Sequence, residues 1–312
     1  MDVARFPDDP RPARWQHPVL ALGNFDGLHR GHIKIIEKIR RVGAERASTP
    51  LVLTFDPHPP RIVRPDKAPQ LLMTLDQKLE ALEKSGIHGV AIVRFTHEVS
   101  RWDPEVFVKS VLVDWLHVAE VWVGADFLFG RDRSGNFSLL RALGALHGFR
   151  AEKIDPVRYK DFVVSSTRIR RLVAEGRVDE AGALLGRHFF VDGSVVRGAG
   201  RGRGIGVPTA NLKTTNELIP PNGVYATTVR VDGVVYPSVT NIGLRPTFDD
   251  VQAPVIEVHV LGLSHDLYDQ RLRLGFIQRL RDERRFPDVD ALKAQIDADI
   301  RRAGRLFDRL SV

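Results

Sequence analysis

Short apolar runs alternate with helical patterns through the first 186 residues, and this alternation constrains the fold more than any other feature of the sequence. The runs that we expect to form strands are Val19–Leu22, Leu51–Phe55, Val90–Phe95, Val118–Val123 and Phe162–Val164. Helices are expected to begin near Gly31, Asp76, Asp103 and Ser138. Asp76 and Asp103 are residue types that cap helices well. The alternation predicts a Rossmann-like, doubly wound parallel sheet that binds ligands at the carboxyl ends of its strands.

The pattern changes after residue 188, where strand-like segments are separated by turn signals such as Asp232-Gly233. These segments are Val224–Val231, Val234–Thr240, Val255–Leu261 and Arg271–Ile277. A final helix is indicated by apolar residues on a rough 3.6-residue period: Leu292, Ile296, Ile300, Leu306 and Leu310. This half predicts a small antiparallel barrel or sandwich carrying a terminal helix. With the boundary near Gly186, we expect two domains, residues 1–186 and 187–312.

Composition limits the class of protein but does not identify its binding partner. The 312 residues suit two domains, and a formal charge of +7 favours anionic partners such as nucleic acid, phosphorylated metabolites or acidic membranes. The absence of cysteine excludes disulfides, thiolate catalysis and cysteine metal sites, and it fits a reducing compartment. The first 17 residues lack the apolar core of a secretory signal, and no uninterrupted apolar stretch is long enough for a membrane span. We therefore expect a cytoplasmic protein.

The first predicted strand runs directly into the sequence GNFDGLHRGH, residues 23–32, and then into a helix. Glycines allow the backbone to approach a ligand, and a helix N-terminus offers free N–H groups and partial positive charge. His29 and His32 are three residues apart, so both can point to one side of the helix start. The pattern predicts a phosphate-binding loop, and its alternative is a solvated turn with two surface histidines. The candidate nucleotide-binding residues here are Gly23, Asn24, Phe25, Asp26 and Gly31.

Three further polar segments follow predicted strands: residues 54–59 (TFDPHP), 124–130 (GADFLFG) and 165–170 (SSTRIR). The last is also a good helix-cap sequence, so capping is its alternative role. Asp126 alone would be as consistent with a structural turn as with a ligand contact. All four segments are expected at the one sheet edge where this fold binds ligands, and this convergence favours a nucleotide site.

Together these four segments resemble the FMN adenylyltransferase module of bacterial bifunctional FAD synthetases, within the wider HxGH nucleotidyltransferase class. The resemblance implies transfer of AMP from ATP to FMN, which yields FAD and pyrophosphate. A phosphate monoester has a second pKa near ~6 and is already ionised at neutral pH, so the acceptor needs no general base. The reaction instead needs alignment and relief of negative charge. The residues expected to provide these are His29, His32 and Arg170, with Ser165, Ser166 and Thr167 binding ATP, Asp126 holding the nucleotide, and Phe55 and His58 forming the flavin-side wall.

A glycine-rich stretch, residues 197–212 (RGAGRGRGIGVPTANL), opens the second half. Its amides can wrap phosphates, although no GK[ST] sequence closes it as in a Walker loop. The alternative is an RG-rich nucleic-acid tail. Thr209 and Asn211 are two apart, so on extended backbone they face the same way and offer two neutral oxygens to Mg²⁺. The candidate ATP-binding residues are Gly200, Gly202, Gly204, Gly206, Pro208, Thr209 and Asn211.

An alcohol is un-ionised at neutral pH, so its phosphorylation benefits from a base. The strand at 255–260 places Glu257 and His259 on one face and its apolar residues on the other. Glu257 is the candidate base, and the alternative is an ordinary solvated strand face.

These features and four more segments resemble a riboflavin kinase domain, a six-stranded barrel; the segments are residues 223–225, 241–248, 256–261 and 280–286. The resemblance implies that Thr209 and Asn211 bind Mg²⁺–ATP, that Glu257 is the base for the ribityl hydroxyl, and that Arg281 lies near the flavin or the phosphates. One departure is Gly262, where the family commonly has Asp.

The expected substrates are therefore riboflavin, FMN and ATP, without a nucleic-acid or membrane partner and with weak self-association left open. One alternative keeps the fold but transfers a nucleotide to another small phosphate, with an inactive barrel. Another is a basic binder of single-stranded nucleic acid. An aromatic content of only 8% argues against the latter, because such binders stack bases on aromatic side chains.

Overall fold

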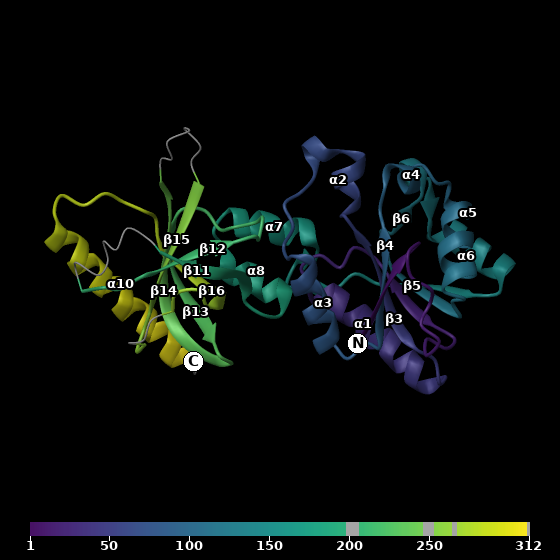
Figure 1. Cartoon of the computed structure of the whole chain (residues 1–312), viewed down its shortest axis with the longest axis horizontal. Coiled ribbons are helices and arrows are strands. Elements are labelled where there is room, and N and C mark those ends of the chain that lie inside the picture. The colour runs from purple at the N-terminus through teal and green to yellow at the C-terminus, as the bar shows by residue number, and fades with distance from the viewer. Residues whose placement is uncertain (198–205, 246–252, 264–266, 311–312) are drawn as a thin grey trace. The chain divides into compact units, whose positions relative to one another are not determined.

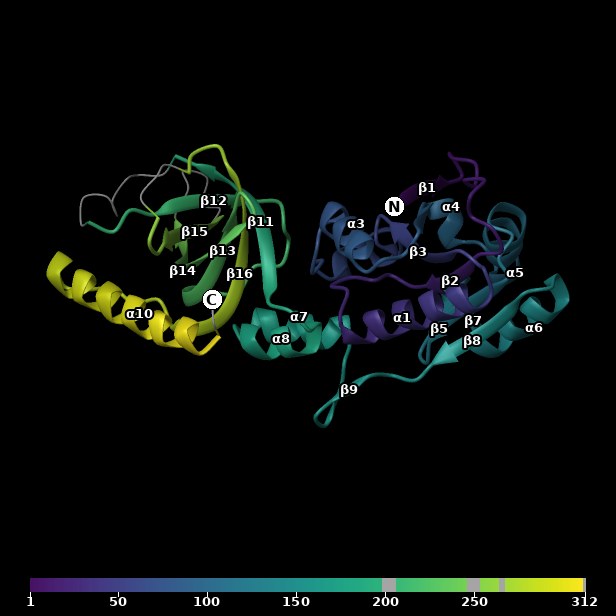
Figure 2. The same ribbon diagram turned by 90° about the horizontal axis from the view of Figure 1, so that it is seen from below.

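The computed structural model describes residues 1–197, 206–245, 253–263 and 267–310. The chain divides into two compact units, Met1–Ser166 and Thr167–Val312, each with its own sheet (Figures 1 and 2). Among the helices within these described ranges, none combines the length and apolarity needed to cross a bilayer.

The first unit is built on a six-stranded parallel sheet in the order β1-β4-β3-β2-β5-β8. Its strands are β1 (Asp2–Phe6), β2 (Val19–Leu22), β3 (Pro50–Asp56), β4 (Gly89–Arg94), β5 (Glu120–Gly124) and β8 (Arg150–Ile154). The central strands are continuous apolar runs because they are covered on both faces, and every residue of β2 is buried.

Helices cover both faces of this sheet. The α-helices of this unit are α1 (Arg30–Glu45), α2 (Pro59–Val63), α3 (Leu75–Lys84), α4 (His97–Ser100), α5 (Pro104–Phe107) with a π-helical continuation over Val108–Trp115, and α6 (Phe137–His147). Val19 and Ala21 contribute to one core with Ile36 of α1, whereas Leu20 and Leu22 contribute to a second core with residues of the π-helical segment and α6. The predicted doubly wound architecture is confirmed.

The sequence did not predict two strands of the sheet, β1 and β8, and the predicted strand at Phe162–Val164 lies outside the sheet. Phe162–Val163 forms β10, which pairs only with β9 (Arg158–Tyr159) in a small antiparallel hairpin. The sheet instead ends at β1 and β8. In β8 only Ala151 is buried, because an edge strand exposes much of its surface, so its sequence carries no apolar run.

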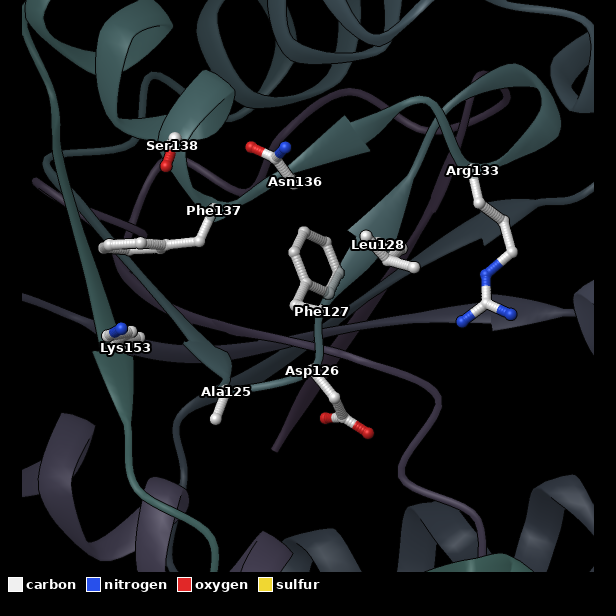
Figure 3. Close-up of a pocket in the computed structure, with 9 residues that line it drawn as sticks. All are labelled: Ala125, Asp126, Phe127, Leu128, Arg133, Asn136, Phe137, Ser138 and Lys153. Carbon is white, nitrogen blue, oxygen red and sulfur yellow. The ribbon is translucent and has the colours of Figure 1, made fainter.

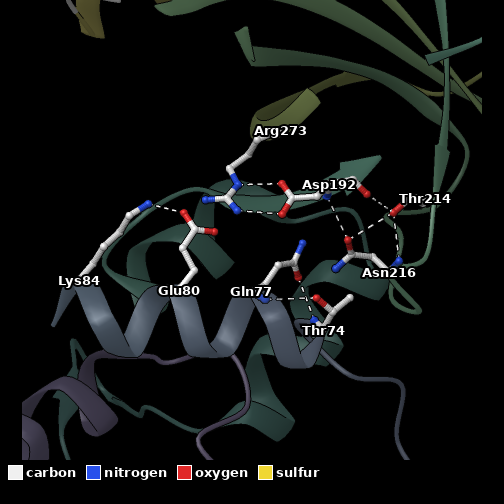
Figure 4. Close-up of polar contacts among 8 residues, drawn as sticks. All are labelled: Thr74, Gln77, Glu80, Lys84, Asp192, Thr214, Asn216 and Arg273. Carbon is white, nitrogen blue, oxygen red and sulfur yellow. Dashed lines mark hydrogen bonds and ion pairs between the residues drawn. The ribbon is translucent and has the colours of Figure 1, made fainter. Parts of the chain in front are cut away.

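Helix starts also differ from the prediction. Thr74, rather than Asp76, caps α3: its hydroxyl accepts from the Gln77 N–H and the Gln77 side chain accepts from the Thr74 N–H, a complete capping box (Figure 4). Asp103 does precede α5, but its side chain makes no capping hydrogen bond and instead lies 2.9 Å from Arg131.

The second unit contains a closed antiparallel barrel in the order β11-β12-β15-β14-β13-β16. Its strands are β11 (Phe189–Val196), β12 (Ala210–Thr214), β13 (Gly223–Val231), β14 (Val234–Arg245), β15 (Ala253–Val260) and β16 (Arg271–Arg281). The predicted six-stranded barrel is confirmed, although β11 and β12 were not identified individually. Asp192-Gly193 interrupts the apolar pattern of β11, and β12 is short and polar.

Polar side chains link three neighbouring strands of the barrel, since β11 pairs with both β12 and β16. The Arg273 guanidinium forms two parallel hydrogen bonds with the Asp192 carboxylate, at 2.7 and 2.8 Å (Figure 4). The Asp192 carbonyl accepts from the Thr214 hydroxyl at 2.6 Å, and the Asp192 N–H donates to the Asn216 side chain at 3.0 Å. Bidentate pairs of this kind fix geometry as well as adding stability.

Within the described part of this half, the α-helices beside the barrel strands are α7 (Ser166–Ala174), α8 (Val178–Leu185) and α10 (Val289–Leu310). Ala303 and Phe307 of α10 are buried against barrel residues such as Val224 and Leu280, with Ile300 and Leu306 beside them. The predicted terminal helix is thus confirmed, although its buried apolar residues Ala303 and Phe307 are not among those expected. The Leu310 side chain lies outside the described residues.

Candidate active sites

The parallel sheet reverses its direction of growth between β2 and β5. From β2 the chain adds β3 and β4 on one side, then returns to place β5 and β8 on the other. The loops after β2 and β5 therefore border the crevice at a topological switch point, where open α/β sheets bind ligands. These are the 23–32 and 124–130 segments, and the end of β3 adds the 54–59 segment to the same edge, as predicted.

The loop after β2 is held in an unusual backbone conformation. Phe25 and Leu28 have φ values of +51° and +39°, a region that non-glycine residues rarely adopt. Both side chains are almost fully buried in the core beside α1. Strain of this kind persists only where surrounding packing enforces it, so this loop has little freedom to change shape.

The two histidines of the loop stack at the start of α1. Their rings lie 3.7 Å apart between centroids and within 14° of parallel. His29 is the N-cap residue, and its Nδ1 accepts the His32 N–H at 3.4 Å. A Cβ atom on Gly31 would approach the His29 ring to 3.1 Å, so glycine between the histidines makes room for the stack. The HRGH spacing thus places two imidazoles at a helix end that favours anions.

Asp26 and Ser166 tie neighbouring segments to this loop. The buried Asp26 carboxylate accepts the backbone N–H groups of Leu72 and Met73 at 3.1 and 3.3 Å. The Ser166 hydroxyl donates to the Asp26 carbonyl at 2.8 Å, so the SSTRIR segment begins beside the loop. Ser165 precedes it and is half-buried. Thr167 and Arg170 lie on α7 and belong to the second unit.

A buried lysine beneath the same loop was not identified from the sequence. The Lys78 ammonium donates to the Asn24 carbonyl at 2.9 Å and to the Thr54 hydroxyl at 3.3 Å. Burial lowers the pKa of Lys78, while the nearby Asp26 and Asp56 carboxylates oppose this by favouring the charged form.

A sequence signal for Lys78 does exist. The residue shares a helical face with Leu75, Leu79 and Leu82, so the 3.6-residue period assigns a lysine to the buried side of α3. Lysine at such a position is rare unless its charge is compensated.

The segment after β5 lines a pocket of about 440 Å³, within the ordinary range for ligand sites. It includes the hairpin of β6 (Leu128–Phe129) and β7 (Gly135–Asn136). The lining residues are Ala125, Asp126, Phe127, Leu128, Arg133, Asn136, Phe137, Ser138 and Lys153 (Figure 3). Asp126 is exposed, and the Lys153 ammonium lies 5.5 Å from the centre of the Phe137 ring.

Aromatic packing links the end of β3 to this pocket segment. The Phe55 ring lies 6.1 Å from Phe107, which in turn lies 6.0 Å from Phe129. His58, at the N-terminus of α2, is buried. Two predicted segments, TFDPHP and GADFLFG, thus share one aromatic cluster.

The second candidate site lies on the outer face of the barrel. Glu257 in β15 pairs with Asn211 of β12 on one side and with Asn241 of β14 on the other. Ile256 and Val258 are each 1% exposed and fill the interior, so the predicted alternation of β15 is confirmed. Glu257 is half-buried between two side-chain amides on adjacent strands. Asn241 was noted within a sequence motif, but only strand pairing brings it to Glu257.

The end of the glycine-rich stretch is held against the same strand. The His259 Nδ1 hydrogen-bonds with the Pro208 carbonyl at 2.8 Å. Thr209 follows immediately and leads into β12, while Gly206 has φ +78° and open space around it. The predicted ATP-binding residues Gly200, Gly202 and Gly204 lie outside the described residues.

Arg281, expected near flavin or phosphate, has a structural partner. Its guanidinium lies 2.9 Å from the Asp299 carboxylate on α10, which also accepts from the Gln295 side chain at 2.9 Å. Asp299 is 4% exposed, so this ion pair joins the last barrel strand to the terminal helix.

Comparison with known proteins also divides the chain into two parts. Residues 11–168 match the family model described as FAD synthetase, and residues 185–307 match that described as riboflavin kinase. Three proteins named bifunctional riboflavin kinase/FMN adenylyltransferase are similar over nearly the full length. The Pseudomonas fluorescens protein is 38% identical over 92% of each chain, and that of Escherichia coli K12 is 37% identical over 93% of this chain and 92% of its own. The Bacillus subtilis protein is 34% identical over 94% and 93%.

A solved structure from Streptococcus pneumoniae, named as a macrolide-efflux protein, is also similar. It is 26% identical, with a TM-score of 0.88 over 96% of this chain and 98% of its own. Its fold therefore matches, whereas the function in its name belongs to that protein alone.

Proposed function

The chain belongs to the bifunctional riboflavin kinase/FMN adenylyltransferase family, and from this premise we propose which of its residues carry out each reaction. The C-terminal part phosphorylates riboflavin with ATP to give FMN, and the N-terminal part transfers AMP from ATP to FMN to give FAD and pyrophosphate. We place the functional boundary at residue 186, giving domains 1–186 and 187–312. The two family matches leave residues 169–184 unassigned, and this interval contains most of α7 and α8.

In the adenylyltransferase, the FMN phosphate attacks the α-phosphorus of ATP without a general base, because its second ionisation lies near ~6. His29 and His32 stabilise the negative charge that develops on pyrophosphate as it leaves. The observation that carries this proposal is the stacked imidazole pair at the α1 N-terminus, beside the sheet's topological switch point. Arg170 and Thr167 assist by binding pyrophosphate.

Substrate binding in this domain falls to the strand-end segments. The backbone of residues 23–31 approaches the ATP phosphates. Asn24, within this segment, is exposed and accessible to ATP. Asp126 holds the nucleotide, while Phe55 and His58 form the flavin-side wall. Asp26, Ser165 and Ser166 shape this site, and the contacts of the Asp26 carboxylate with Leu72 and Met73 favour a positioning role for it.

In the kinase, Glu257 accepts the proton of the ribityl hydroxyl as that oxygen attacks the γ-phosphorus of ATP. The supporting observation is its position between Asn211 and Asn241 on three adjacent strands. The side-chain oxygens of Thr209 and Asn211 suit Mg²⁺, a hard cation that prefers oxygen and takes its remaining ligands from phosphates and water. When bound, Mg²⁺ offsets charge on the transferred phosphoryl group. Arg281 fixes β16 to α10 through its ion pair with Asp299. Its predicted contact with the flavin is a second role, which is tested separately.

The direct test is to incubate the protein with riboflavin, Mg²⁺ and ATP and to separate the flavins. FMN should appear first and FAD should follow. Absence of both products would contradict the assignment, and FMN alone would leave only the kinase standing.

Two controls exclude the alternatives. Other phosphate monoesters, offered with ATP or CTP in place of FMN, should not be converted. Binding to single-stranded nucleic acid should be weak, whereas a true nucleic-acid binder would show tight, steeply salt-dependent affinity. A cytoplasmic location and weak self-association stay predictions.

A further inference from the structure

We propose that Lys78 is a positioning residue for FAD formation: its buried ammonium group holds the Asn24 carbonyl and thereby the loop that leads into His29 and His32 at the start of α1. This inference rests on the proposed assignment of residues 23–32 to the FMN adenylyltransferase site.

The contacts around Lys78 converge on a single backbone atom. The Asn24 carbonyl oxygen accepts the Lys78 ammonium at 2.9 Å and the Thr54 hydroxyl at 3.0 Å. The ammonium also donates to the Thr54 hydroxyl at 3.3 Å, which closes a triangle among α3, β3 and the loop after β2. Lys78 is 7% exposed and Thr54 is fully buried, so water cannot easily replace these bonds.

A second contact joins the loop to the same helix region. The Asp26 carboxylate accepts the N–H groups of Leu72 and Met73, three and two residues before α3 begins. The loop is thus held on either side of Phe25, the residue with φ +51°. Since an unfavourable backbone conformation survives only when its neighbours are fixed, these two contacts explain how Phe25 is kept in place.

Charge matters to this role as well as shape. A buried ammonium is costly unless it is compensated, so a lysine on an apolar helix face needs its partners. Asp26 and Asp56 favour the charged form of Lys78 against the effect of burial. A neutral side chain of equal length would fill the same space but would leave the Asn24 carbonyl short of one donor.

Lys78→Met should lower kcat for FAD formation by about ten- to a hundredfold, the range expected when a charge-assisted hydrogen bond is lost. The riboflavin kinase rate of the same protein should be unchanged, because that site lies in the other unit. Lys84→Met is the matched control. It makes the same change on the same helix, but Lys84 is exposed and pairs with Glu80 at the surface (Figure 4), so both activities should persist.

The chain's lack of cysteine allows a sharper version. Lys78→Cys can be alkylated in denaturant with 2-bromoethylamine, which restores an ammonium at lysine length, or with 1-iodopropane, which gives a neutral chain of equal length. After refolding, the aminoethyl protein should form FAD at least about tenfold faster than the propyl protein. Equal FAD rates would overturn the proposal, because packing alone would then account for Lys78.

Folding is checked in the same samples. All four tryptophans, at positions 15, 102, 115 and 122, lie in the first unit, so their fluorescence reports whether that unit has refolded. FAD rates are compared per folded molecule on this basis.

His32→Ala, measured in parallel, separates this inference from its premise. If that variant makes FAD at the wild-type rate, the loop assignment itself is wrong. If it loses FAD formation while the two alkylated proteins remain equal, only the role of Lys78 falls.

Discussion

The two proposed sites of this chain are positioned by different means. In the first unit, His29 and His32 lie at the start of α1, directly after a loop whose backbone is strained and held by buried contacts. In the second, Glu257 lies in a row with Asn211 and Asn241, placed by strand register alone. A loop site depends on tertiary contacts from many parts of the chain, whereas a strand site depends on pairing with its immediate neighbours.

The chemistry differs in parallel. FMN brings an already ionised phosphate, so its site needs charge relief and alignment. Riboflavin brings an alcohol, so its site needs a base. The proposed roles of the histidine pair and of Glu257 correspond to these two demands.

The largest expected effect tests the base. Glu257→Gln should lower the riboflavin kinase rate by about a thousandfold, since a general base contributes on that order. FAD formation from supplied FMN should be unchanged. Flavin separation from reactions started with each substrate measures both. If the mutant keeps full kinase activity, riboflavin does not need Glu257 as a base, and the proposed difference between the two acceptors is wrong.

His32→Ala should lower FAD formation by about a hundredfold or more, in line with the loss of one preorganised group facing developing charge. FMN formation should persist. Initial rates with FMN and ATP provide the measurement, and His88→Ala, a histidine in the turn that precedes β4, serves as control. Loss of both activities in a folded protein would refute separate sites.

Arg281→Met tests whether this residue acts through α10. Removing the guanidinium leaves Asp299 buried without its ion-pair partner, which should cost about 3 kcal/mol of stability in the second unit. Chemical denaturation monitored by the loss of kinase activity gives this value. If stability holds while the KM for riboflavin rises, Arg281 instead contacts the flavin directly.

Asn211→Ala should raise the kinase KM for Mg²⁺–ATP by about tenfold, the cost of one lost polar contact to a charged group. Titrations of Mg²⁺ and ATP measure it. Lys213→Ala, two residues along the same exposed face of β12, should leave it unchanged. An unaltered KM in the Asn211 variant would remove this residue from the metal site.

The smallest effect concerns pH. The folded pKa of Lys78 lies below its ordinary value of 10.5, so the unfolded chain holds more protons between those two values and the free energy of unfolding rises with pH there. Below the folded pKa, Lys78 is protonated in both states, so its contribution to the free energy of unfolding does not change with pH. Relative to Lys78→Met, the wild-type first unit should gain stability as pH rises towards 10.5, as followed by tryptophan fluorescence. A flat difference would contradict the shift.

The sequence predicted those elements whose apolar pattern reports burial directly. The strand Val19–Leu22 was predicted to the residue, and the alternation around Glu257 was correct because one face of β15 is core. Edge strands β1 and β8 were missed, since exposure removes the apolar run that prediction relies on.

Site residues were predictable where local spacing brings them together, as for His29 and His32 within one turn. Lys78 and Asn24 are 54 positions apart, and their contact follows from how α3 packs beneath the loop. Asn241 and Glu257 meet only because β14 and β15 pair in one register. A local sequence pattern predicts neither the Lys78–Asn24 contact nor the pairing of Asn241 with Glu257.

The pairing of β15 has an implication for how the kinase half can fail. Side chains alternate between the two faces of a strand, so sliding β15 by one residue would bring Glu257 into the apolar interior and expel Ile256 and Val258. The same slip would thus displace the proposed base and disrupt the core together. A molecule that phosphorylates riboflavin has, by that fact, assembled its barrel correctly.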